Sequence, residues 1–421
     1  MSDYSISGKT RSYLFGFMIL GLLSMAATWF VDDAMHTRFW SNFLHNSVFF
    51  TGIAFMAAFF IAICITAYAG WPSVFKRIWE AFTVFLVPGL ILMVIIALST
   101  YFGFNHLYHW ADSASVAEDT ILQGKSSFLN RNWYLFGTLI IVGVWIFIAQ
   151  KLRSLSIAED KDGGDVNFRH HRKMRFWAAI FLPVAGFSSA AIIWQWVMSV
   201  DAHWYSTLFA WYTGASWFVS MICMTLLVII YLKGKGYYDL ITVEHVHDLG
   251  KFLFAFSIFW TYLWFSQYML IWYGNVGEET VYFKHRMDEY PVLFFGNLII
   301  NFVLPFLILM RNDTKRKFGS IGFVAGLVLF GHWIDFFLML KPGILHTAHE
   351  VASHAGDHGN AEAVEHASHF TMGFTIPGLL EIGTFLGFGA LFLFVFFTAL
   401  GKTALVPKND PYLQESIHHH V

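Results

Sequence analysis

AFTVFLVPGLILMVIIALSTYF, residues 81–102, decides the fold class, because it runs for 22 residues without a charged side chain. About 20 apolar residues cross the hydrocarbon core of a bilayer as an α-helix. Similar stretches recur at residues 12–31, 47–69, 132–150, 176–199, 208–232, 251–273, 292–310, 319–340 and 374–400. Open sheets leave backbone groups unsatisfied in lipid, and these runs are longer than barrel strands. We therefore predict an all-α polytopic membrane protein of ten spans, in one integral membrane domain, 1–421.

The composition agrees with a lipid-facing surface. Of the 421 residues, 57% are hydrophobic and 13% are charged, about half the charged share of soluble domains. The two cysteines, Cys64 and Cys223, lie in apolar runs and form no CxxC, CxxCH or zinc-finger spacing. We expect no disulfide, covalently bound cofactor, iron–sulfur cluster or metal site from them. The absence of a basic stripe argues against nucleic acid as a partner.

Lys and Arg are spread unevenly over the two sides that the spans define. The N-terminus, the C-terminus and every second loop carry 20 of the 26 basic residues, and the other loops carry six. Short loops rich in Lys and Arg stay in the cytoplasm. The pattern predicts that both termini are cytoplasmic.

The longest predicted outer loop, 341–373, is rich in histidine. Its histidines are His346, His349, His354, His358, His366 and His369. No fixed spacing assembles them into one coordination shell. We favour a solvated or partner-contacting segment over a metal site there.

Ionisable residues within spans are functional candidates, because each is costly at the bilayer centre. His332 and Asp335 share one face of the ninth span, and Glu381 lies near the outer end of the tenth. All three are expected outward of the centres of their spans. Asp201 and His203 lie where the fifth span emerges on the same side. These five could line one outer cavity, and the alternative is a set of interhelical hydrogen bonds without a transport role.

A second polar group precedes the seventh span. It consists of Glu244, His245, His247 and Asp248. Carboxylates and imidazoles at a membrane mouth can collect protons, since histidine titrates near neutral pH. The alternative is that they are the ordinary charges of a wet helix end.

Between these groups the middle of the bilayer contains neutral polar side chains, among them Asn301 and Gln195. This pattern fits two half-channels separated by a gap. His332 is the only histidine deep within a predicted span, so a haem held by two histidines is not expected. No nucleotide or phosphate motif occurs.

Four stretches resemble the ActF subunits of bacterial alternative complex III, which are similar to the NrfD and PsrC membrane subunits. They are SVDAHWYSTLFAWY (199–212), HDLGKFLFAFSIFWTYLWFSQYMLIWYGNVGEETVYF (247–283), GHWIDFFLMLKP (331–342) and LVPKNDPYLQESIHHH (405–420). The resemblance extends from the fifth span to the C-terminus. Over residues 1–175 it is supported mainly by the number and order of the spans.

The resemblance implies two four-helix bundles with peripheral helices, in a subunit of a quinol:cytochrome c oxidoreductase rather than an enzyme alone. It implies the bacterial inner membrane, quinone or quinol as a ligand, and phospholipid contacts. The implied partners are an ActC-like sister subunit, an iron–sulfur subunit, a multihaem cytochrome subunit and a terminal oxidase. Haem and iron–sulfur clusters are expected in those partners only.

The resemblance also implies roles for single residues. His332, Asp335 and Glu381 would form the outer half of a proton pathway. Glu244, His247 and Asp248 would form the inner mouth of that pathway. Asp201 and His203 would lie at a rim beside the quinone site. The residues alone leave open a structural scaffold and a stand-alone proton-coupled transporter, although a transporter would need a midplane site.

Overall fold

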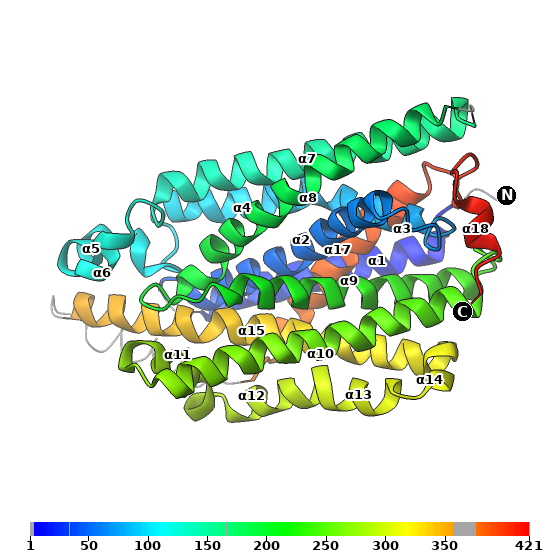
Figure 1. Cartoon of the computed structure of the whole chain (residues 1–421). Helices are drawn as coiled ribbons and strands as arrows, with labels where there is room; N and C mark the ends of the chain where they lie inside the picture. The colour runs from blue at the N-terminus through cyan, green and yellow to red at the C-terminus, as the bar shows by residue number, and fades with distance from the viewer. Residues whose placement is uncertain (1–3, 33, 165–166, 357–375, 421) are drawn as a thin grey trace.

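Ten helices among the described residues are long and apolar enough to cross a membrane, and they form one helical body (Figure 1). The protein is represented by a computed structural model that describes residues 4–32, 34–164, 167–356 and 376–420. The crossing helices are α1(Gly8–Val31), α2(Thr37–Thr66), α3(Lys76–Phe82) continued by η1(Thr83–Phe85) and α4(Leu86–Tyr101), α7(Arg131–Asp162), α8(Arg169–Trp196), α9(Leu208–Gly234), α10(Val243–Gly274), α12(Pro291–Leu298) continued by η4(Ile299–Val303) and α13(Leu304–Leu309), α15(Phe318–Gly356) and α17(Leu379–Leu400). The predicted all-α polytopic membrane fold is confirmed.

Short helices lie at the two ends of this body. They are η2(His109–Ala111), α5(Ser113–Glu118), α6(Thr120–Lys125), η3(Met198–Val200), α11(Gly277–Glu289), α14(Asn312–Arg316) and α18(Leu413–Ile417). Both termini and α18 lie at one end, here named the terminal end, and α5, α6 and α11 lie at the opposite end, here named the loop end (Figure 1).

The crossing helices pack as two groups of four with one outlying pair. The first group contains α2, α3–α4, α7 and α8, and the second contains α9, α10, α12–α13 and α15. Helices α2 and α8 pack on α9, and α2 also packs on α15, so these contacts join the groups. Helix α1 packs mainly along α17. This arrangement matches the two bundles and peripheral helices that we expected.

Helix α2 begins ten residues before the predicted span, at Thr37 instead of residue 47. The sequence is polar there, but the polar side chains of Arg38, Asn42 and His45 are buried in the body of the protein. Hydropathy alone places the start of a span after such polar residues. Packing against other helices buries them here, so the helix begins earlier.

The predicted outer loop 341–373 is wrong in its first part, because α15 continues to Gly356. Pro342 lies inside the helix, although proline removes a backbone hydrogen bond there. Lys341, Ile344 and Leu345 are buried, so packing holds this turn in helical form. Residues 357–375, with His358, His366 and His369, lie outside the described residues.

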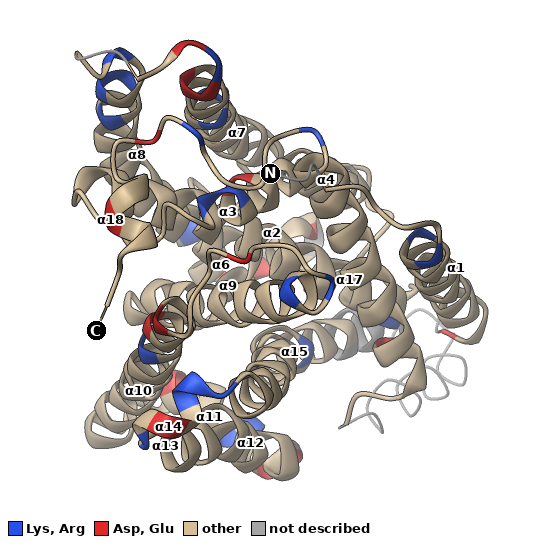
Figure 2. Cartoon of the chain, turned by 90° about the vertical axis from the view of Figure 1, so that its right-hand side faces the viewer, with Lys and Arg blue, Asp and Glu red and all other residues tan. Residues whose placement is uncertain are grey.

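Charged residues are concentrated at the ends of the helices. Figure 2 looks onto the terminal end and shows Lys and Arg around α1, α3, α8 and α14. The chain segments at this end include the loops that carry the larger share of basic residues. The terminal end is therefore the end that the sequence predicts to be cytoplasmic.

Candidate functional site

Asp335, on α15, is the centre of a buried polar cluster in the second helix group. Its side chain is completely buried. Tyr212 Oη and Asn297 Nδ2 donate to Oδ1, the latter at 2.8 Å. Ser216 Oγ and Trp260 Nε1 donate to Oδ2 at 3.0 and 2.9 Å. Four neutral donors from α9, α10 and α12 thus saturate a carboxylate acceptor without neutralising its charge.

His332 lies one helical turn from Asp335 and is also completely buried. Its Nδ1 lies 2.8 Å from Ser216 Oγ and 3.9 Å from Asp335 Oδ2. Ser216 donates to Asp335, so it accepts from His332 Nδ1–H and connects the two ionisable groups. His332 Nε2 has no hydrogen-bond partner among the described residues. With Nδ1 as the donor to Ser216, Nε2 is left as an unpaired acceptor in the interior, where most polar atoms are hydrogen-bonded.

The helix beside this cluster is irregular. Residues Ile299–Val303 form a π-helical turn, and Pro305 follows it. Such turns frequently occur at functional sites. The turn places Asn301, whose Nδ2 donates to Asn297 Oδ1 at 2.6 Å, against Gly331 of α15. A Cβ at Gly331 would lie 2.2 Å from Asn301 Oδ1, so the close approach requires glycine.

The candidate membrane span of α15 covers Phe318–Ala348 among the described residues and so continues past residue 340, where the predicted span ended. His332 and Asp335 lie on either side of its midpoint. Their depth in the bilayer stays a prediction.

A small cavity lies between this cluster and α11 at the loop end. Its lining includes Tyr212 and Asn297 from the cluster and Tyr282 and Arg286 from α11. It has room for about one water molecule. Asp335 itself does not line the cavity, but two of its hydrogen-bond donors do.

Arg286 closes the outer end of this cavity. Its guanidinium donates to Asp201 Oδ2 at 2.8 Å and to the carbonyl oxygens of Leu338 and Met339 at 2.9 and 3.2 Å. Burial alone would lower the pKa of Arg286, but Tyr282 and Asp201 outweigh it and raise this pKa. Arg286 is thus a permanent cation, and the sequence analysis did not single it out because it lies outside the spans.

Glu381 lies in a different cluster, between α17 and α2. Arg38 Nε and Nη2 donate to its two oxygens at 2.6 and 2.8 Å, and Asn42 Nδ2 donates at 2.9 Å. The backbone N–H of Gly378 donates a fourth bond at 3.0 Å. Glu381 is therefore a neutralised, fully bonded carboxylate, unlike Asp335.

His45, on α2, is a further buried histidine of the crossing helices. It lies in the part of α2 that the predicted span left out, and its Nε2 is 2.9 Å from the carbonyl oxygen of Trp333. Trp333 Nε1 in turn donates to Asn46 at 3.1 Å, and Asn46 bonds Asn42. These bonds lie between the Glu381 and Asp335 clusters.

Asp201 and His203 diverge. Asp201 pairs with Arg286 beside the cavity. His203 instead contacts Asp119 in the segment between α5 and α6, and much of its side chain is exposed. The five residues predicted to line one outer cavity are thus distributed over three places.

The residues of the predicted inner mouth lie at the terminal end. Its two carboxylates form ion pairs. Glu244 pairs with Arg316 at 2.9 Å, and Asp248 contacts both Lys251 and His419 at 2.6 Å. His247 is buried, and neither of its ring nitrogens has a hydrogen-bond partner in the described part of the chain.

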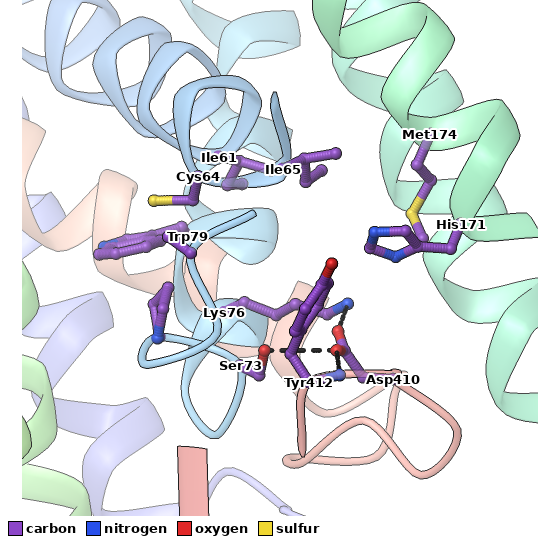
Figure 3. A pocket seen from close by; sticks show the side chains of 12 residues that line it. Ile61, Cys64, Ile65, Ser73, Lys76, Trp79, His171, Met174, Asp410 and Tyr412 are labelled. Carbon is purple, nitrogen blue, oxygen red and sulfur yellow. Dashed lines mark hydrogen bonds and ion pairs between the residues drawn. The ribbon is translucent and has the colours of Figure 1, made fainter. Parts of the chain in front are cut away.

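The structure reveals another ionisable cluster at the terminal end, in the first helix group. Figure 3 shows Lys76 and Asp410 as an ion pair facing His171 and Tyr412 across a small cavity. Burial would raise the pKa of Asp410, but Lys76 and the bonds to it lower this pKa below its ordinary value.

A three-charge network lies next to that cavity. Arg77 bonds Glu80 at 2.5 Å and also bonds Asp160 of α7. In the sequence, Lys76 and Arg77 contributed only to the predicted membrane orientation. Asp410 and Asp160 are distant from them in sequence. Only the Arg77–Glu80 pair, three residues apart on one helix, could have been predicted from the local sequence.

The comparisons with protein-family models and with curated proteins find no match to this chain. The resemblance to ActF subunits accordingly rests on the four sequence stretches alone.

Proposed function

We propose that this chain is an integral membrane subunit of a bacterial respiratory quinol-oxidising complex of the alternative complex III type. In this proposal it has no redox centre of its own and supports electron transfer from quinol while carrying protons across part of the membrane. Support comes from the resemblance in residues 199–212, 247–283 and 331–342, and from the polar cluster around Asp335, to which all three stretches contribute.

The observation that supports the proton role is that Asp335 is buried and is bonded only by neutral donors. A carboxylate buried among apolar helices is expensive, and such residues are usually paired or functional. Asp335 has four neutral donors and an imidazole one turn away, whereas Glu381 has an arginine. Loss of the charge on Glu381 would strand the buried guanidinium of Arg38, whereas none of the four donors to Asp335 carries a permanent charge. Asp335 and His332 are therefore the stronger candidates.

The arrangement suggests the order of the groups along a proton path. Ser216 links His332 to Asp335, and Tyr212 links Asp335 to the cavity below Arg286. The hydroxyls can pass a proton by rotating. Arg286 repels an excess proton in the cavity, so it favours the return of the proton to Asp335.

The inner half of the path is assigned to the terminal end. His247 is a buried imidazole with unbonded nitrogens, beside the paired Glu244 and Asp248. The Lys76–Asp410 and Arg77–Glu80 groups offer a second entry. Quinone would bind at the rim near Asp201, on the side expected to face an iron–sulfur subunit.

The test begins with purification from native membranes through a tag on this chain. Haem, iron and quinone should co-purify, and the preparation should oxidise quinol. In proteoliposomes, Asp335→Asn should lower proton translocation about tenfold or more while the complex still assembles, which corresponds to at least 1.4 kcal/mol in the barrier. Full translocation by Asp335→Asn would refute the proton role.

A matched control is Asp313→Asn, which removes an exposed aspartate in a weak 3.5 Å ion pair at the terminal end. It should leave translocation unchanged. If instead Asp335→Asn changes only assembly or thermal stability, with normal turnover and translocation, the subunit is a structural scaffold of the complex.

A proton-coupled transporter is a second candidate, favoured by one observation. Asp335 lies near the middle of its span beside the broken helix α12–η4–α13, and transporter sites occur at discontinuous helices near the midplane. Purification of the chain without haem or iron–sulfur partners, together with proton-driven solute uptake, would select this candidate.

A further inference from the structure

Three side chains that come from separate segments converge at the loop end. They are His109 in η2, Asp119 between α5 and α6, and His203 in the link between η3 and α9. One donor atom of each lies within 4.8 Å of the others, and the two imidazole centroids are 5.5 Å apart. Their sequence separation explains why no metal-ligand spacing was visible.

His109 is held in place by its neighbours. Tyr108 is buried and bonds both Tyr134 Oη and the carbonyl oxygen of Trp196 at 2.9 Å. Arg131 donates to the carbonyl oxygen of Ala111 on the other side of His109. The short helix η2 is therefore fixed on α7 and α8, and the His109 side chain is largely buried.

Asp119 has one oxygen committed and one directed at the histidines. Oδ1 caps α6 by accepting from the backbone N–H groups of Ile121 and Leu122 at 2.7 and 3.2 Å. Oδ2 contacts His203 Nε2. A carboxylate oriented by backbone donors is a pre-organised ligand, because its rotamer is already fixed.

His203 is fixed through its main chain. Lys125 Nζ donates to the carbonyl oxygens of Ala202 and His203 at 2.6 and 3.3 Å. The next residue, Trp204, stacks on Tyr282 with ring centroids 3.9 Å apart. Lys125 brings a positive charge near Asp119, but burial lowers the pKa of its ammonium.

We propose that His109, Asp119 and His203 form a binding site for a divalent transition metal, Zn²⁺ in the first place. Two imidazoles and one carboxylate are a ligand set that zinc accepts, and a water can complete a tetrahedron. The exposed side of His203 leaves room for that water. This assignment does not depend on the proposed respiratory role.

The bound metal would tie three segments together at the loop end. It would connect η2 and the α5–α6 hairpin to the link that begins with Asp201, which holds Arg286 above the cavity. Zinc binding is therefore expected to stabilise this end of the protein and to restrict the outer rim of the Asp335 cavity.

The test is a zinc titration of the purified full-length protein in detergent against a competing fluorescent chelator. His109→Gln, Asp119→Asn and His203→Gln should each remove one high-affinity equivalent. Asp119→Asn is the most informative variant, because asparagine caps a helix as well as aspartate does and so preserves α6. Each variant should melt at the parent's temperature without zinc.

His106→Gln is the matched control, since His106 belongs to the same segment and not to the cluster. It should keep the parent stoichiometry, and so should changes to the histidines of residues 346–369 and 418–420. Zinc should raise the melting temperature of the parent and of His106→Gln, but not of the three ligand variants.

X-ray absorption of the zinc bound to the parent should report two imidazole ligands. If the parent binds no high-affinity zinc, or if the three variants bind as much as the parent, the cluster is only an ion pair beside a histidine and the proposal fails.

Discussion

Asp335 and Glu381 have completely buried side chains, yet their partners give them different physical roles. The donors around Asp335 are neutral, so adding a proton to Asp335 changes the net charge of the cluster. Glu381 is paired with Arg38, and losing its charge would strand a buried cation. We therefore expect opposite phenotypes, with function lost at Asp335 and stability lost at Glu381.

Glu381→Gln should destabilise the protein by about 3–5 kcal/mol, because it leaves Arg38 buried without a counter-ion. The double variant Glu381→Gln with Arg38→Met should recover much of this loss, since it removes both charges. Thermal unfolding in detergent measures both effects. A double variant no more stable than Glu381→Gln alone would show that the pair itself is not the cause.

The sequence singled out three of the buried ionisable residues in the crossing helices but could not assign their partners. His332, Asp335 and Glu381 stand out because charges are rare in apolar runs. Arg38 did not, since it lies in a polar stretch that only tertiary packing makes helical. The donors to Asp335 are neutral residues such as Tyr212 and Trp260, which carry no signal in an aromatic-rich chain.

At the level of the helices, the close crossing of α1 and α17 depends on glycine. A Cβ on Gly21 would lie 2.5 Å from the Cα of Gly387, and one on Gly383 would lie 2.1 Å from Ser24 Oγ. Membrane helices without a hydrophobic driving force associate through such small-residue contacts.

Gly21→Ala should therefore cost about 1–3 kcal/mol, because the backbones must separate. Gly16→Ala is the control, since a Cβ there meets nothing within 4 Å. Thermal unfolding, and the yield of a disulfide engineered between α1 and α17, measure the separation. Equal behaviour of the two variants would contradict the close packing.

The segment that follows α17 is fastened to α3 by the Asp410–Lys76 pair. Asp410→Asn should lower stability at pH 7 by about 1.5–3 kcal/mol, the contribution of a charged hydrogen bond. The folded pKa of Asp410 is depressed. Its contribution is therefore present above the unfolded pKa of about 3.9 and is lost as pH falls through the folded pKa.

The stability difference between the parent and Asp410→Asn should thus be constant from neutral to weakly acidic pH and shrink in strong acid. Asp313→Asn, an exposed pair, should show almost no difference at any pH. A difference that grew on acidification would have the wrong sign for a depressed pKa.

Element boundaries were harder to predict than element existence. Each apolar run became a helix, because lipid leaves the backbone no other way to satisfy its hydrogen bonds. The ends of α2 and α15 were misplaced where polar residues or Pro342 are buried against neighbouring helices. The π-helical turn at Ile299–Val303 had no sequence signal beyond Pro305, since it arises from the contact of Asn301 with Gly331.

For the whole molecule, the decisive property is the direction in which the bundle crosses the membrane. Residues near the terminal end carry 20 of the 26 basic side chains, so this end should face the cytoplasm. Both native cysteines, Cys64 and Cys223, are buried, which leaves a low background for labelling. Ser126 is exposed at the loop end and Lys161 is exposed at the terminal end.

In intact cells, a membrane-impermeant maleimide should label Ser126→Cys and spare Lys161→Cys, and both should react after the membrane is opened. Because the ten helices alternate in direction, these two sites fix the orientation of the entire bundle. The result also decides the direction of the proposed proton path, since Arg286 and its cavity lie toward the same end of the bundle as Ser126. Labelling of Lys161→Cys alone in intact cells would invert the molecule and with it the assignment of proton entry and exit.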